Sequence, residues 1–157
     1  MAKFGAVPKE PPASKALDDL APGFRAIVEQ ILARDPNRVI AESYRSPARS
    51  DWLFGMGRDY DDGRGVVTKA GAGASWHNYG LAVDVIHRVH AWDATPAFWD
   101  ALAADAIAAG LTAGAKWTFK DLPHIQWGKM PASPNDHART ALAAGAVESL
   151  WAEVGAA

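Results

Sequence analysis

Two short polar motifs contain the residues best suited to chemistry. The first spans 75–85 and places His77 and Asp84 seven positions apart, and the second spans 121–127 and adds His124. Two imidazoles and one carboxylate are a known ligand set for catalytic zinc, which keeps one coordination position open. We therefore expect His77, Asp84 and His124 to bind one zinc ion.

A carboxylate and an arginine complete the expected chemistry. Asp121 lies three residues before His124, close enough to reach an attacking water without binding the metal. It suits a general base that passes the water's proton to a leaving amine, while zinc lowers the pKa of that water and polarises the scissile carbonyl. Arg45 can bind a substrate carboxylate or the developing oxyanion. The side chains that we expect to contact substrate are Arg45, Ser75, Tyr79, Gln126 and Trp127.

Strand alternation explains how these side chains are presented. Residues 81–86 alternate as in a strand, which places Asp84 on the face opposite to the apolar residues of the core. Residues 124–127 also predict a strand, with His124 and Gln126 on one face and two apolar side chains on the other. Arg45 follows a third alternating segment, 38–44. The metal ligands are therefore expected on the polar face of a sheet.

The rest of the chain predicts an α+β protein with one catalytic domain over 1–157 and an irregular lead-in over 1–13. Apolar periodicity and capping residues predict helices over 15–34 (with a break at Pro22), 46–57, 95–109 and 135–154. A further strand is expected over 116–119. A glycine- and aspartate-rich loop is expected over 59–74, with room for a short strand at 66–67.

Composition limits the partners and the type of metal site. The net charge of −2 and the pI of about 6.2 give no reason to expect a nucleic-acid partner or stable membrane association. The absence of cysteine excludes thiolate ligands and disulfides. The N-terminus lacks the apolar segment of a signal peptide, and no apolar run approaches the roughly 18 residues of a membrane span. We expect a monomer that is made in the cytoplasm and acts after release.

Other polar clusters are weaker candidates. His87 and His90 follow the 81–86 strand into a loop, and His137 lies at a helix start, so we interpret all three as surface residues. The aspartates of 59–62 resemble a calcium loop, but the bidentate glutamate that such a loop requires is missing. A solvated turn is the better interpretation.

The two metal motifs, in this order and with Arg45 upstream, resemble the M15 family of zinc peptidases. The resemblance is strongest to the L-alanyl-D-glutamate endopeptidases, a branch that includes phage endolysins and bacterial wall hydrolases. The matching segments are 44–47, 67–70, 75–84 and 121–127. Relatives often have Trp-Gly-Gly where this chain has residues 112–117, and Glu where it has Gln126.

The resemblance implies a small antiparallel sheet that carries the zinc site and is flanked by helices, as in D-Ala-D-Ala peptidases and Hedgehog-type domains. It implies His77, Asp84 and His124 as zinc ligands, Asp121 as the base and Arg45 as a substrate-binding arginine. The implied substrate is the peptidoglycan stem peptide, cut between L-Ala and D-Glu by a phage endolysin made in the host cytoplasm. The alternatives are a D-alanyl-D-alanine carboxypeptidase and a non-catalytic zinc-containing wall-binding module.

Overall fold

The computed structural model describes residues 3–157 and contains one four-stranded sheet. The strands are β1 (Arg38–Glu42), β2 (Ala82–His87), β3 (Thr112–Ala113) and β4 (His124–Gln126). Their order in the sheet is β1-β2-β4-β3, and every neighbouring pair is antiparallel. The expected α+β class with a small antiparallel sheet is confirmed.

Five α-helices surround this sheet. They are α1 (Pro22–Ala33), α2 (Pro47–Gly55), α3 (Pro96–Ala108), α4 (Asp136–Ala143) and α5 (Val147–Glu153). The predicted capping residues Ser46, Thr95 and Asn135 accept backbone N–H bonds at the starts of α2, α3 and α4. Side-chain oxygens at these positions satisfy N–H groups that the first helical turn leaves free. None of the helices described within residues 3–157 has the length and apolar character needed to cross a membrane.

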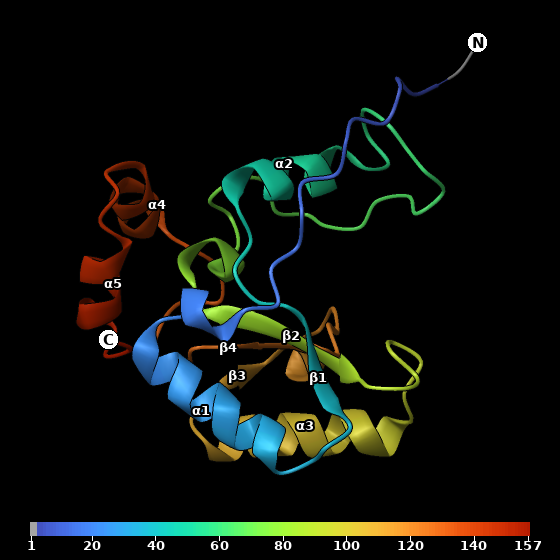
Figure 1. The fold of residues 1–157 in the computed structure, drawn as a ribbon. Helices are drawn as coiled ribbons and strands as arrows, with labels where there is room; N and C mark the ends of the chain where they lie inside the picture. The colour runs from blue at the N-terminus through green and yellow to red at the C-terminus, as the bar shows by residue number, and fades with distance from the viewer. Residues whose placement is uncertain (1–2) are drawn as a thin grey trace.

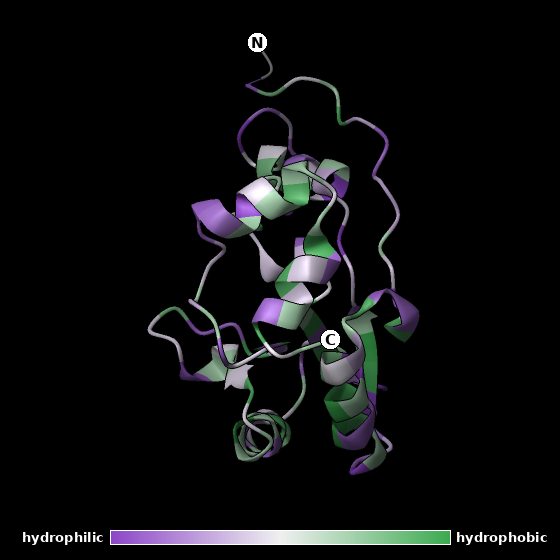
Figure 2. Ribbon diagram, turned by 90° about the vertical axis from the view of Figure 1, so that its left-hand side faces the viewer, coloured by the Kyte–Doolittle hydropathy of each residue, from purple (hydrophilic) through white to green (hydrophobic). Residues whose placement is uncertain are grey.

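The hydrophobic core lies between the sheet and the helices α1 and α3. In Figure 1 these two helices run side by side below the sheet, and they contact each other. Figure 2 shows hydrophobic residues gathered where α1 meets the sheet. The core joins side chains of α1 and α3 to Val83 and Val85 of β2 and Ile125 of β4, all fully buried or nearly so. The helices thus cover one face of the sheet and leave the polar side chains of β2 and β4 on the other.

A bulge in β1 changes which side chains lie on that polar face. Ile40 pairs with Val85, but the next paired residue of β1, Glu42, lies opposite Asp84, so Ala41 is the extra residue. A bulge of this kind redirects the side chains that follow it. Regular alternation over the predicted strand 38–44, continued to Arg45, would place Glu42 and Arg45 on opposite faces. The strand instead ends at Glu42, and both side chains line the same cleft.

Several predicted elements differ in the structure. The segment 15–34 divides into a 3-10 turn, η1 (Leu17–Asp19), and α1, which Pro22 begins. The predicted helix 135–154 is the pair α4 and α5, because Gly145 between them adopts a positive φ of 70°. No strand forms at 66–67 within the described loop.

The strand predicted over 116–119 is also absent from the described structure. Residues 116–119 instead comprise the end of the 3-10 turn η3 (Gly114–Lys116) and a bend, and the short β3 precedes them. The carbonyl of Gly114 accepts hydrogen bonds from the backbone N–H groups of Trp117 and Asp121. The chain therefore curls around Gly114 instead of extending, and this curl brings Asp121 back toward β4.

Candidate active site

A tightly capped turn positions His77. It lies in the 3-10 turn η2 (Trp76–Tyr79), where Ser75 and Asn78 form a capping box. Gly80 ends the turn with φ of 67°, and a side chain there would meet the carbonyl oxygen of Asp19 at 2.6 Å. Only glycine fits both the left-handed conformation and the close approach. The chain can therefore reverse at Gly80, shortly after His77, and enter β2.

Sheet register positions the other two ligand candidates. Asp84 of β2 lies directly opposite His124 of β4 in their antiparallel ladder. Directly paired residues have their side chains on the same face and only a few ångströms apart. The seven-residue spacing in the first motif and the distant second motif therefore meet at one place.

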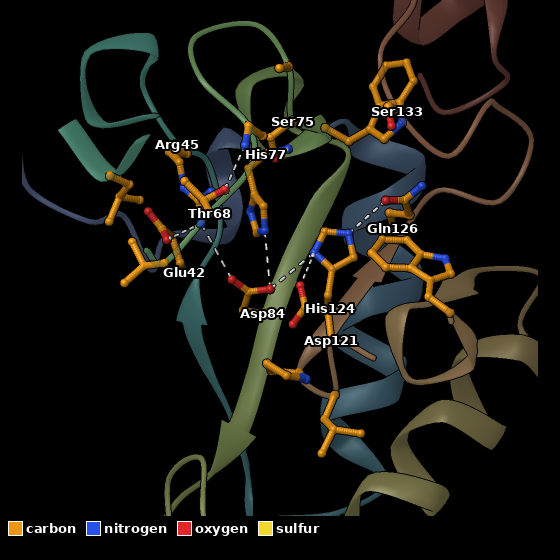
Figure 3. A pocket seen from close by; sticks show the side chains of 18 of the residues that line it. Glu42, Arg45, Thr68, Ser75, His77, Asp84, Asp121, His124, Gln126 and Ser133 are labelled. Carbon is orange, nitrogen blue, oxygen red and sulfur yellow. Dashed lines mark hydrogen bonds and ion pairs between the residues drawn. The ribbon is translucent and has the colours of Figure 1, made fainter. Parts of the chain in front are cut away.

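The three side chains point toward one another, as Figure 3 shows. Asp84 Oδ1 lies 3.3 Å from His77 Nε2 and 3.3 Å from His124 Nδ1, and one potential ligand atom from each residue lies within 4.8 Å of the others. The His77 and His124 side chains are only 3% and 8% exposed, whereas Asp84 is 19% exposed toward the cleft. The structure thus brings together all three predicted ligands.

Hydrogen bonds on the outer side of each imidazole orient it for metal binding. His77 Nδ1 lies 2.8 Å from the Ser43 carbonyl oxygen, so it carries the proton and leaves Nε2 free. His124 Nε2 lies 2.8 Å from Gln126 Oε1, and the Gln126 amide nitrogen donates to the Ala132 carbonyl. This amide orientation makes His124 Nε2 the donor and leaves Nδ1 free. Such outer partners are typical of histidines that bind metals.

The electrostatics of the group favour a charged carboxylate. Burial by itself raises the pKa of Asp84, but His77 and His124 outweigh it and hold that pKa well below its usual range. Burial opposes protonation of His124, yet the hydrogen bond to Asp84 raises the pKa of the imidazole. The carboxylate therefore has two imidazole partners, as a charged group in a largely buried position requires. Two oriented nitrogens and one anionic oxygen fit a cation such as zinc.

Asp121 lies beside this group, in the position predicted for a base. Its Oδ2 is 4.0 Å from His124 Nδ1, and the side chain is 49% exposed to the cleft. Partial burial, and then the negative charge of Asp84, raise the pKa of the Asp121 carboxyl. Because Asp121 is outside the group of three potential ligands, it can receive a proton without giving up a metal bond.

Arg45 lies on the opposite side of Asp84 from His124 (Figure 3). Its backbone N–H donates to the His77 carbonyl, and its own carbonyl accepts from the Asn78 side chain. Arg45 Nη2 lies 2.7 Å from Glu42 Oε2 and 3.8 Å from Asp84 Oδ2. The sequence analysis did not select Glu42. One feature of the sequence could have identified it: Glu42 is an acidic residue inside a predicted strand, three positions before Arg45.

A cleft of about 600 Å³ opens over these residues. Of the expected substrate contacts, Arg45, Ser75 and Gln126 line it. Tyr79 and Trp127 do not: both point into the protein, where the Tyr79 hydroxyl donates to the Gly73 carbonyl and the Trp127 indole to that of Val154. Both expectations are corrected. The cleft also receives aromatic residues that the sequence analysis did not select, namely Trp92, Trp99 and Trp117.

The weaker candidates lie outside the site. His87, the last residue of β2, stacks against His90 in the loop that follows, and exposed His137 pairs with Glu153. In the aspartate-rich loop, Asp61 accepts backbone N–H bonds from Gly63 and Gly65. None of these residues belongs to the potential metal-binding group found within 3–157.

Two histidines and an aspartate that could hold a metal ion, with an adjacent carboxylate in an open cleft, are the arrangement of a metallopeptidase site, and comparisons with known proteins agree. A family model of the M15 peptidases, described as D-alanyl-D-alanine carboxypeptidase, matches residues 68–127. The chain is 31% identical over 124 residues to the peptidoglycan L-alanyl-D-glutamate endopeptidase CwlK of Bacillus subtilis, covering 69% of this chain and 73% of that relative. The chain therefore belongs to the M15 peptidase family, whose members are in general zinc-dependent.

A solved structure supports the fold. The crystal structure of the Serratia marcescens L-Ala D-Glu endopeptidase ChiX aligns with a TM-score of 0.52 and 21% sequence identity. The alignment covers 71% of this chain and 82% of ChiX. At this identity the match establishes a shared fold.

Proposed function

We propose that the protein is a zinc-dependent peptidoglycan endopeptidase that cuts the stem peptide between L-Ala and D-Glu. The proposal rests on the convergence of His77, Asp84 and His124 beside Asp121, in an M15 family member. CwlK and ChiX are both L-Ala–D-Glu endopeptidases, which supports the choice of bond.

The side chains present suit peptide hydrolysis. His77, Asp84 and His124 would hold the zinc, which supplies Lewis-acid chemistry by lowering the pKa of a water molecule and polarising a carbonyl. Asp121 takes the proton of the attacking water and delivers it to the departing amine. Arg45, as a fixed cation in the cleft wall, binds a carboxylate of the stem peptide or the oxygen on which negative charge develops.

Two alternatives predict different outcomes. A D,D-carboxypeptidase uses the same kind of metal site but removes one terminal D-Ala, and the description of the matching family model keeps this alternative open. A wall-binding module would use the metal only for structure. The half-exposed Asp121, free of any metal ligand role, favours an enzyme.

The deciding experiment is digestion of defined muropeptides by the zinc-loaded protein, with products read by mass spectrometry. We expect a fragment with a new D-Glu amino terminus, and we expect a chelator to abolish its release. Loss of a single D-Ala would assign the protein to the carboxypeptidases. Binding of intact peptidoglycan without any released fragment would support the binding module.

The biological setting is a second part of the proposal. A phage endolysin made in the host cytoplasm would act on peptidoglycan only after a partner permeabilises the membrane. Expression in a bacterial host should then leave cells intact until the membrane is permeabilised chemically, and lyse them promptly afterwards. An Asp121→Asn variant expressed to the same level is the control. Lysis without permeabilisation would contradict this setting but not the proposed activity.

A further inference from the structure

Glu42 is a buried carboxylate that joins two arginines in the wall of the cleft. It is 6% exposed, and its Oε2 accepts a hydrogen bond of 2.7 Å from Arg45 Nη2. Its other oxygen accepts from Nε of Arg49. Burial alone would raise the pKa of Glu42, but the bonds from Arg45 and Arg49 lower it, so the carboxylate is charged. Nothing in the proposed hydrolysis so far uses this residue.

We propose that Glu42 is a positioning residue that holds Arg45 over the cleft and keeps its 3.8 Å ion pair with Asp84, a candidate metal ligand, from closing to hydrogen-bond distance. The predicted loss of activity rests on the proposed function, whereas the predicted loss of zinc affinity does not. The partner that it acts through is Arg45, and the group that it protects is Asp84.

The geometry places Arg45 between two competing carboxylates. Nη2 is 2.7 Å from Glu42 and 3.8 Å from Asp84 Oδ2. Nε of Arg45 is buried without a hydrogen-bond partner, and the bond to Glu42 is the one side-chain hydrogen bond that Arg45 makes within residues 3–157. If Glu42 loses its charge, Asp84 becomes the nearest carboxylate, and a shift of about 1 Å turns the existing 3.8 Å ion pair into a hydrogen-bonded one.

A hydrogen-bonded Arg45–Asp84 pair would harm the site in two ways. It would draw electron density from the carboxylate that faces both histidines, which weakens zinc binding. It would also withdraw the guanidinium from the cleft, where a substrate carboxylate or oxyanion would otherwise meet it. Glu42 prevents both effects because it satisfies Arg45 on the side away from the histidines (Figure 3).

The surrounding structure fixes Glu42 in this role. The β1 bulge at Ala41 places Glu42 directly opposite Asp84 on the cleft side of the sheet. Behind it, Nη1 of Arg49 donates to Glu10 Oε1 at 3.0 Å and to the Pro11 carbonyl at 2.9 Å. Arg49 is therefore anchored by the N-terminal segment as well as by α2. A carboxylate bonded to an anchored arginine cannot rotate away, so its second oxygen stays directed at Arg45.

A double-mutant cycle of Glu42→Gln and Arg45→Ala tests the inference. Zinc affinity is measured by competition with a chromogenic chelator, and kcat and KM are measured with the peptide that the wild type cleaves. The matched control is Asp105→Asn, which removes a carboxylate 2.7 Å from buried Arg38 on the same strand, away from the cleft. All variants are compared below their melting temperatures, so that loss of folded protein does not contribute to the measured differences in zinc affinity, kcat and KM.

We expect Glu42→Gln to lower kcat/KM about tenfold or more and to weaken zinc binding severalfold, with Asp105→Asn at wild-type values for both. In the Arg45→Ala background, Glu42→Gln should have no further effect on either quantity, because residues that act through one another are not additive. Additive losses, or equal losses in Asp105→Asn, would overturn the inference. If the wild type cleaves no stem peptide, the proposed function is wrong. The zinc affinities of the double-mutant cycle still test whether Glu42 positions Arg45.

Discussion

Gln126 offers the sharpest test of how the metal group is built. Its Oε1 lies 2.8 Å from His124 Nε2, and its amide nitrogen donates to the Ala132 carbonyl. The side chain is 2% exposed, so no bulk water can replace it. We predict that Gln126→Leu, which keeps the approximate volume but removes the acceptor, weakens zinc binding through His124 without touching a ligand atom.

The size of the effect follows from the burial of this hydrogen bond. Leaving a buried N–H without an acceptor costs about 1–3 kcal/mol. The imidazole can avoid that cost by moving its proton to Nδ1, which lies 3.3 Å from Asp84 Oδ1, but zinc must then displace the proton. At about 1.4 kcal/mol per factor of ten, zinc affinity should fall roughly 10- to 100-fold. Outer hydrogen bonds of other metal-binding histidines have effects in this range.

Competition against a chromogenic chelator measures the zinc dissociation constant directly, without a substrate. Trp127→Phe is the matched control, because it removes a neighbouring buried hydrogen bond, to the Val154 carbonyl at 2.7 Å, on the other side of β4. Gln126→Glu is the second comparison and should bind zinc at least as tightly as the wild type, since a charged acceptor makes the imidazole a better donor.

Equal zinc affinity in Gln126→Leu and the wild type would refute this reasoning. It would mean that β4 and the sheet register alone orient His124. A loss in Trp127→Phe as large as that in Gln126→Leu would also refute it, because the effect would then come from general loosening of β4.

Three further predictions concern the base, its backbone support and acid stability. Asp121→Asn should lower kcat at least 100-fold with zinc affinity unchanged, measured by peptide cleavage and chelator competition; retained activity would exclude Asp121 as the base. Gly114→Ala should also lower kcat, because the new Cβ would lie 2.5 Å from the Asp121 carbonyl oxygen and displace the base; a wild-type rate would contradict this. The folded-state pKa of Glu42 lies below its ordinary value of 4.5, so its stabilising effect is complete above pH 4.5 and is lost as the pH falls through the lowered value. Glu42→Gln should therefore unfold with a weaker acid dependence below pH 4.5, and an unchanged acid dependence would contradict the assignment.

Much of the site was predictable because its signals are local in the sequence. His77, Asp84 and His124 lie in short motifs whose strand alternation already separates polar from apolar side chains. Capping residues such as Ser46 and Thr95 also act within one turn, so the helix starts they predict agree with the structure. Local rules failed where the chain curls around Gly114 and where Gly145 divides the last helix in two.

The sequence by itself determined which groups are available for chemistry: the candidate donor atoms, a carboxylate beside the third of them, a nearby arginine and an α+β framework. The tertiary structure decided which side chains can reach the cleft. Tyr79 and Trp127, both within the motifs, point into the protein, whereas Glu42 enters the site through a bulge that no alternation pattern indicates. The physical reason is that strand register, bulges and the close approach of Gly80 to Asp19 depend on contacts between distant segments. A residue's type and spacing do not contain those contacts.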